Sequence, residues 1–230
     1  MAAVRVRDGR VVRWASIRRG DYGIPSVAFD GTTDGISADG RTLVLATRGA
    51  QVVHGGVSRF AVIRLPSLRL RQTIILQGLW SFDALSPDGQ TMYAIEYQAV
   101  APTVRYRVRA IDVATGRPRP GAIVDRREPD ERMSGAPVTR AGGVRTAWAY
   151  TLYAKSNGTA FIHALDTRSA RAMCIELPWR GVQKAVWAVR MTVRTNGRML
   201  VLRQPRVGLL ATIDLNRFVV RSIRRPVAER

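Results

Sequence analysis

The chain has 230 residues and a hydrophobic fraction of 46%, which favours a packed globular domain over a disordered chain. No apolar run is long enough to span a bilayer, and the charged N-terminal stretch has no apolar core of a signal peptide. The formal net charge of +20 suggests a polyanion partner, but the arginines are scattered along the chain, so we expect solvated strand faces and do not expect nucleic-acid binding.

The first predicted element is a pair of strands in residues 1–20. The stretches "AAVRV" and "VVRWASI" flank an "RDG" turn, which is typical of two antiparallel strands. We expect this pair to form a half-blade of a larger repeat structure.

Four repeats of about 50 residues follow, at about 33–77, 80–124, 136–177 and 187–223. Each has a strand, a turn, a second strand, a loop, a third strand ending in Asp or Pro, a short turn and a fourth strand. The second strands are "RTLVLAT", "QTMYAIEY", "TAWAYTLY" and "GRMLVLRQ". Four strands in about 50 residues predict the blade of a β-propeller, so we expect an all-β fold in one propeller domain spanning residues 1–230.

The first turn of a repeat is clearest as "SADG" at residues 37–40 and "SPDG" at residues 86–89. Asp caps the turn with its side chain and Gly tolerates a positive φ, so Ser86 and Asp88 are interpreted as turn formers. The third repeat has lost the Asp-Gly pair at "TRAGGVRTAW" and must build its turn differently.

The "SPDG" turn followed by "QTMYAI", together with "AIDVATGR", resembles the WD40-like and YVTN-type β-propeller repeats of bacterial proteins. The resemblance covers residues from about 33 to 223. It implies a propeller, and such propellers serve as scaffolds, as binding modules and in some cases as enzymes.

Residues 1–20 match the third and fourth strands of a blade whose first two strands are missing. Either the ring is small with an incomplete fifth blade, or an upstream part of the protein is absent from the sequence, which we favour. In the second case we expect an extracytoplasmic protein of the cell envelope, and otherwise a cytoplasmic one.

Blade geometry places the connections after the second and fourth strands at one end of the propeller, which we call the long-loop face. Long connections on a rigid scaffold are where binding concentrates. The connections expected on this face are residues 19–35, 47–58, 97–104, 125–137, 154–160 and 178–187.

Three of these connections contain candidate ligand-binding residues. The candidates are Asp21 and Tyr22 in "GDYGIP", Glu128, Asp130 and Glu131 in "DRREPDER", and Trp179 with Arg180 as an exposed aromatic and cation pair. The alternatives are a structural turn at Asp21, a self-paired charged loop at residues 125–132, and a tryptophan packed between blades.

The chain has no nucleophile elbow, phosphate loop or dinucleotide fingerprint, so no cofactor and no catalytic residue is predicted. His54 and His163 lie in different blades, and Cys174 is alone, so neither residue type indicates a metal site. We therefore expect a non-catalytic scaffold that binds a protein, peptide or glycan on the long-loop face. The alternative is a hydrolase or lactonase-like enzyme with a channel-bound metal, with Asp83, Glu96 and Asp130 as first candidates.

Overall fold

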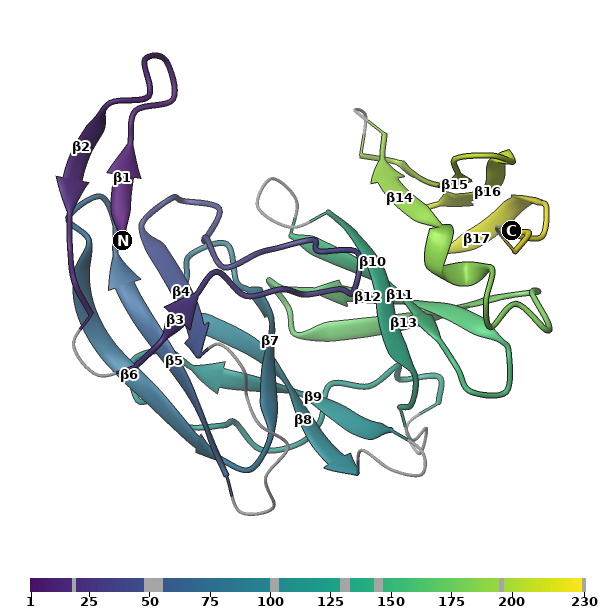
Figure 1. Ribbon diagram of the computed structural model, residues 1–230. Helices are drawn as coiled ribbons and strands as arrows, with labels where there is room; N and C mark the ends of the chain where they lie inside the picture. The colour runs from purple at the N-terminus through teal and green to yellow at the C-terminus, as the bar shows by residue number, and fades with distance from the viewer. Residues whose placement is uncertain are drawn as a thin grey trace.

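The computed structural model describes residues 1–17, 20–47, 56–99, 104–128, 133–142, 147–194 and 197–228. Within these residues the strands form five antiparallel sheets (Figure 1). The one described helix, η1 (Val186–Ala188), has three residues, and no described segment forms a helix that could cross a bilayer.

Each sheet is built from strands that are consecutive in the chain. An N-terminal hairpin holds β1 (Ala2–Val4) and β2 (Val11–Trp14). The first sheet holds β3 (Tyr22–Gly23), β4 (Thr42–Thr47), β5 (Val57–Arg64) and β6 (Arg69–Gln77), and the second holds β7 (Trp80–Leu85), β8 (Thr91–Ala99) and β9 (Arg105–Asp112). The third holds β10 (Ala136–Gly142), β11 (Trp148–Ala154), β12 (Ala160–Asp166) and β13 (Arg171–Leu177), and the fourth holds β14 (Arg190–Val193), β15 (Met199–Gln204), β16 (Gly208–Asp214) and β17 (Val219–Ile223).

The four larger sheets follow one another around an arc, with the hairpin standing at one end of it (Figure 1). A meander of antiparallel strands repeated around a centre is the architecture of a β-propeller. The prediction of four blades and an N-terminal half-blade is therefore confirmed. The described residues do not close the arc into a ring.

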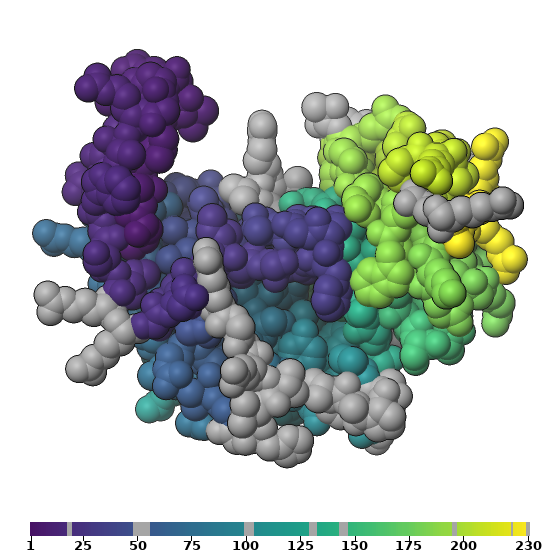
Figure 2. All heavy atoms as spheres, viewed as in Figure 1, coloured from purple at the N-terminus to yellow at the C-terminus, as the bar shows by residue number. Residues whose placement is uncertain are grey.

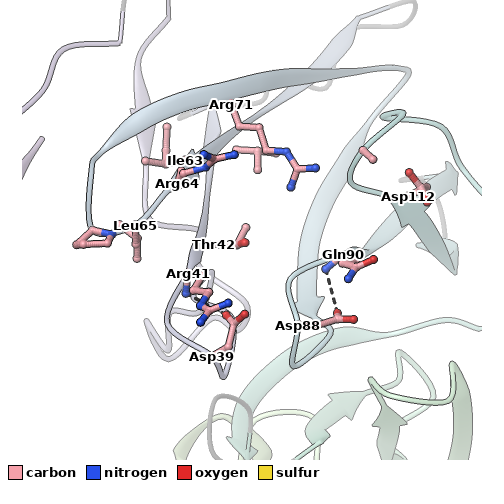
Figure 3. A pocket seen from close by; sticks show the side chains of 13 residues that line it. Asp39, Arg41, Thr42, Ile63, Arg64, Leu65, Arg71, Asp88, Gln90 and Asp112 are labelled. Atoms are coloured by element: carbon pink, nitrogen blue, oxygen red, sulfur yellow. Dashed lines mark hydrogen bonds between the residues drawn. The ribbon is translucent and has the colours of Figure 1, made fainter.

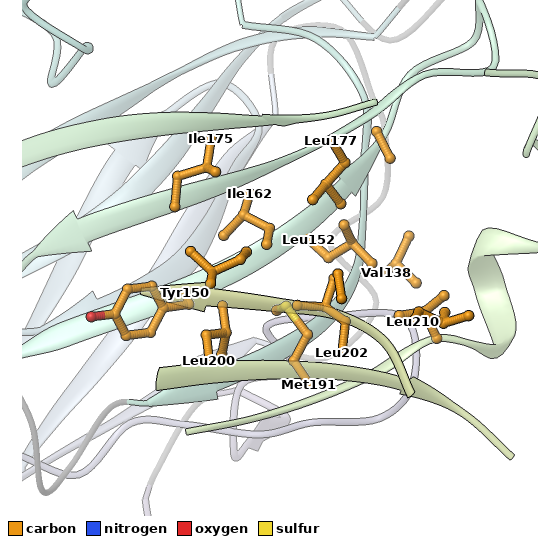
Figure 4. Close-up of a cluster of buried hydrophobic side chains, with 14 of the residues drawn as sticks. Val138, Tyr150, Leu152, Ile162, Ile175, Leu177, Met191, Leu200, Leu202 and Leu210 are labelled. Atoms are coloured by element: carbon orange, nitrogen blue, oxygen red, sulfur yellow. The ribbon is translucent and has the colours of Figure 1, made fainter. Parts of the chain in front are cut away.

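The hydrophobic core lies between neighbouring sheets and not inside any one of them. Figure 4 shows the cluster between the third and fourth sheets, where Leu152 and Ile162 of one sheet face Leu200 and Leu202 of the other. Similar clusters join the first sheet to the second and the second to the third. Because neighbours cover both faces of a middle strand, six of the seven residues of β12 are buried, which explains its continuous apolar sequence.

The second sheet has three strands among the described residues, so the prediction of four strands in this repeat is wrong. Its expected fourth strand makes only isolated bridges, Ile111 with Pro118 and Val108 with Ile123. Pro118 and Pro120 have no N–H to donate to a ladder, which explains the interruption. The chain then leaves this sheet, and Asp125 forms a parallel bridge with Ala172 of β13.

The innermost strand of the first sheet is also interrupted. Tyr22 and Gly23 pair with the end of β4, and the strand expected before the "SADG" turn contributes only a bridge from Ile36 to Leu43. The residues between them, 24–35, leave the sheet and extend toward β10 (Figure 1). We call residues 24–35 the crossing segment.

The two repeated turns contact each other across the first and second sheets. In each, the Ser hydroxyl donates to the Asp carboxylate at 2.6 Å, in the pairs Ser37 with Asp39 and Ser86 with Asp88. The Asp39 N–H also donates to the Pro87 carbonyl at 3.1 Å. The turn is therefore repeated because it both reverses the chain and joins one blade to the next.

Gly89 is the residue of this contact with the least room for change. A Cβ added there would lie 2.5 Å from the Thr42 hydroxyl oxygen, whereas one at Gly40 meets nothing within 4 Å, and both residues have positive φ. We expect Gly89→Ala to lower the free energy of unfolding by about 2–3 kcal/mol and Gly40→Ala by about 1 kcal/mol. Urea unfolding of both variants measures the difference, and equal losses would contradict the inter-blade contact.

Candidate functional site

The long-loop face carries a groove of about 290 Å³ between the second, third and fourth sheets. We call it the long-loop groove. Its lining residues are Val104, Gly135, Ala136, Ala154, Lys155, Ser156, Gln183 and Trp187. All of them lie in four of the connections expected on this face, residues 97–104, 125–137, 154–160 and 178–187. The structure thus brings together loops that are far apart in the sequence.

Small residues let these loops approach closely. A Cβ on Gly135 would lie 2.8 Å from the Ala154 carbonyl oxygen, and one on Gly158 would lie 2.4 Å from the Gln183 amide nitrogen. The Val182 N–H donates to the Gly158 carbonyl at 3.2 Å, which ties the two loops together. The groove therefore has walls fixed by backbone contacts.

Trp187 is the large aromatic residue of the groove. It lies in η1, where its neighbour Val186 and the following Val189 are fully buried and anchor the turn. The Trp187 side chain is 42% exposed. Phe29 of the crossing segment meets it edge to face, with ring centroids 5.7 Å apart. A partly exposed tryptophan on a fixed turn is the kind of residue that anchors a bound partner.

Lys155 supplies a positive charge at the edge of the groove. Its ammonium group lies 3.1 Å from the Glu176 carboxylate and 4.6 Å from the centre of the Phe161 ring. The side chain is only 20% exposed, so the charge is held in place by an ion pair and an aromatic face. The groove combines apolar walls with a fixed cation.

The crossing segment reaches this region from the first sheet (Figure 2). The Phe29 N–H donates to the Pro137 carbonyl at 2.9 Å, and the Asp30 N–H donates to the Val138 carbonyl at 3.2 Å. Burial raises the pKa of Asp30, but hydrogen bonds from Thr139 and Thr32 outweigh it and lower the pKa overall. The Asp30 carboxylate is therefore charged and lies 3.9 Å from the Arg190 guanidinium.

Arg140 fixes the base of the crossing segment. Its buried guanidinium pairs with Asp83 of β7, lies 3.9 Å from the Asp34 carboxylate and donates to the Thr151 hydroxyl at 3.0 Å. Burial raises the pKa of Asp34, and the charge of Arg140 opposes this rise. One arginine thus connects the first, second and third sheets.

The residues proposed from the sequence do not converge on one point. Asp21 is exposed, and Tyr22 packs partly buried on the core of the first sheet. Glu128 is exposed, and its N–H donates to the Asp125 carbonyl at 3.0 Å. Asp130 and Glu131 lie outside the described residues.

Trp179 and Arg180 do not form the exposed pair that the sequence suggested. Trp179 is fully buried between the third and fourth sheets, which is the alternative of a tryptophan packed between blades. Arg180 is exposed, and its carbonyl accepts from Arg225 at 3.2 Å. Both tryptophans lie in the "PWRGVQKAVW" stretch. Packing buries Trp179, and Trp187 lines the groove.

The start of the acidic loop is self-paired. The Asp125 carboxylate accepts from the Arg127 guanidinium at 2.6 Å and from the Cys174 N–H at 2.8 Å. Burial raises the pKa of Asp125, but the bonds from Arg127 and Cys174 outweigh it and lower the pKa to about 2. Asp125 therefore joins this loop to β13 and is not available as a ligand.

The carboxylates proposed for the alternative metal site form ion pairs where the structure describes them. Asp83 pairs with Arg140, and Glu96 pairs with Arg107 and Arg109. His163 is buried, and burial lowers its pKa to about 4. His54 lies outside the described residues. Among the residues that the structure describes, no group of three or more His, Cys, Asp or Glu side chains could hold a metal ion.

Comparison with known proteins gives structural likenesses of low identity. No protein-family model matches the chain, and no curated protein sequence matches it. A puromycin hydrolase is similar with 18% identity and a TM-score of 0.47, over 83% of this chain and 28% of the hydrolase. The Dos1 propeller is similar with 10% identity and a TM-score of 0.48, over 84% of this chain and 51% of its own.

TolB from Acinetobacter baumannii is similar with 12% identity and a TM-score of 0.42, over 72% of this chain and 37% of its own. The chain thus spans about half or less of the length of these three proteins. Likenesses at this level say nothing about what the chain binds or whether it catalyses a reaction.

The role of Arg140 leads to a prediction about stability. In Arg140→Leu the buried carboxylates of Asp83 and Asp34 lose their counter-charge, so we expect the free energy of unfolding at neutral pH to fall by about 3–5 kcal/mol. Arg190→Leu is the comparison variant, because the Arg190 side chain is 52% exposed and hydrogen bonds from Thr139 and Thr32 still stabilise the charged Asp30 carboxylate without it, so it should cost less than about 1 kcal/mol.

The loss of unfolding free energy in Arg140→Leu, which we call the deficit, should also depend on pH. When folding raises the pKa of a carboxyl group, that group does not destabilise the folded state below its ordinary pKa of 3.8, because it is protonated in both states. Above the raised pKa it lowers the free energy of unfolding by its full amount, because the folded state must then hold the charge. Removal of Arg140 raises the pKa of Asp34 further, so the deficit should shrink as the pH falls. Denaturant unfolding at neutral and acidic pH measures this, and a deficit independent of pH would contradict the assignment.

Proposed function

We propose that this chain is a non-catalytic β-propeller scaffold that binds an extended peptide segment of a protein partner in the long-loop groove. The observation that carries the proposal is that four separate connections form one groove with the partly exposed Trp187 in its wall. Aromatic residues are enriched among those that dominate binding energy at protein interfaces.

The size and lining of the groove favour a peptide. About 290 Å³ is room for a few side chains and lies at the lower end of the volumes of small-molecule sites. The walls are apolar at Val104, Ala136 and Ala154, while Lys155 and Gln183 offer polar groups at the edge. An apolar side chain fits these walls, and an acidic group beside Lys155 would have to share its ammonium group with Glu176, which already pairs with it at 3.1 Å.

Of the three carboxylates named for a hydrolase, the two that the structure describes are engaged in ion pairs. Asp83 pairs with Arg140, and Glu96 pairs with two arginines of β9, Arg107 and Arg109. A carboxylate in such a pair is a poor ligand or general base, because binding or proton transfer must first break the pair. We therefore do not assign a reaction to these residues.

Selection of a displayed peptide library on the immobilised chain, with a glycan array in parallel, tests the proposal. We expect peptides with an apolar residue near an acidic one, and we expect Trp187→Ala to weaken their binding by about 2 kcal/mol or more. Trp14→Ala is the matched control, because Trp14 is 74% exposed on the distant β2 and should leave affinity unchanged.

Calorimetric titration of one selected peptide gives the affinities of the three proteins. Equal losses in Trp187→Ala and Trp14→Ala would show that binding is not located at the groove. If glycans bind and no peptide is selected, the ligand is a glycan and the proposed peptide ligand is wrong.

A further inference from the structure

A second and larger groove lies at the opposite end of the blades. It has a volume of about 840 Å³ and is lined by short turns of both the first and the second sheet (Figure 3). We call it the short-turn groove. Its lining residues are Asp39, Arg41, Thr42, Val62, Ile63, Arg64, Leu65, Pro66, Arg71, Asp88, Gln90, Asp112 and Ala114. Three arginines and three aspartates thus share one groove.

The aspartates of the short-turn groove are held in fixed positions by their turns. Asp39 accepts from the Ser37 hydroxyl and the Arg41 N–H, and Asp88 accepts from the Ser86 hydroxyl and the Gln90 N–H. Asp112 accepts from the Thr115 N–H at 2.8 Å and from the Arg119 guanidinium at 3.5 Å. These bonds lower the pKa of all three carboxyl groups, so the groove keeps its negative charge in mildly acidic solution.

The arginines of the groove come from the first sheet and are exposed. Arg41 follows the "SADG" turn, Arg64 ends β5, and Arg71 lies near the start of β6 (Figure 3). All three are exposed, and none of them forms an ion pair with a described carboxylate. Arg41 lies in the same turn as Asp39 and its charge helps to lower the pKa of that carboxyl group, whereas Arg64 and Arg71 form no hydrogen bond or ion pair with the groove carboxylates.

The groove is therefore dipolar. The first sheet supplies three guanidinium groups and the Asp39 carboxylate beside Arg41, so Arg64 and Arg71 are its excess positive charges, and the second sheet supplies Asp88 and Asp112 on the other side. Leu65 and Pro66 add apolar surface to the groove, while Val62 and Ile63 are fully buried beneath it. A ligand that fits must offer a negative group to one wall and a positive group to the other.

We infer that the short-turn groove is a second binding site, for a peptide segment that carries acidic and basic side chains in close succession. Each wall of the groove attracts one of the two charges and repels the other, so a mixed-charge segment is favoured over a segment of a single sign. The same repulsion from the fixed aspartates disfavours a uniform polyanion such as nucleic acid. This site is separate from the long-loop groove and does not depend on the function proposed for it.

Three synthetic peptides of equal length test the inference by calorimetric titration at low salt. One alternates Glu and Lys, one has Glu with Ser in place of Lys, and one has Lys with Ser in place of Glu. We expect the alternating peptide to bind most tightly. The double variant Arg64→Ala with Arg71→Ala should weaken its binding about fivefold to tenfold, since exposed charges contribute modestly.

Two controls separate the groove from net charge. Arg69→Ala removes the same charge from the same hairpin but from a residue that does not line the groove, so it should leave the affinity unchanged. Asp88→Asn retains an oxygen that accepts the turn hydrogen bonds and removes the charge. It should weaken the alternating peptide and strengthen the Glu-Ser peptide.

The inference is overturned if the Glu-Ser peptide binds the wild-type chain at least as tightly as the alternating one, which would describe a simple cationic surface. It is also overturned if Arg69→Ala costs as much as the double variant, or if no peptide binds. Trp187→Ala should bind the alternating peptide as the wild type does, and loss of binding in that variant would place the peptide in the other groove.

Discussion

Arg140 carries a buried positive charge between carboxylates that come from two different sheets. Asp83 lies on the innermost strand of the second sheet, and Asp34 lies at the base of the crossing segment. Burial of these groups is tolerated only while they remain paired, because a single uncompensated charge would cost several kcal/mol. The pairing therefore fixes where the crossing segment leaves the first sheet, and with it the position of Phe29 beside Trp187. The long-loop groove depends on this buried arrangement.

The two ends of the blades differ for a physical reason. At the short-turn end the Ser-x-Asp-Gly turns contact each other, so their sequences are constrained by packing as well as by chain reversal. At the long-loop end the connections differ from blade to blade, and the contacts between them come from glycines and from backbone hydrogen bonds. Similar turns leave a charged groove between two sheets, and dissimilar loops form an apolar one. A rigid array of sheets thus presents two grooves of opposite character.

Local chemistry made much of the fold predictable. The Asp-Gly turns, the alternation of the strands and the spacing of about 50 residues predicted the blades and the end at which the long connections gather. The second sheet lacks a fourth strand because Pro118 and Pro120 interrupt its hydrogen-bond ladder. Both prolines are visible in the sequence, but the prediction of four strands followed the repeat pattern alone. The crossing segment could not be predicted, because its path depends on tertiary contacts to Pro137 and Val138. For the same reason the sequence offered Trp179 as exposed, whereas packing buries it and leaves Trp187 at the groove.

Hydrogen exchange at two backbone amides tests the docking of the crossing segment most directly. The Phe29 and Asp30 N–H groups donate to carbonyls of residues 137 and 138, although the Phe29 side chain is 72% exposed. If the segment is held as described, these two amides should exchange as slowly as those in the middle of β10 and β11. Exchange at the rate of an unstructured chain, with β10 and β11 still protected, would show that the segment does not dock and that Phe29 does not support Trp187.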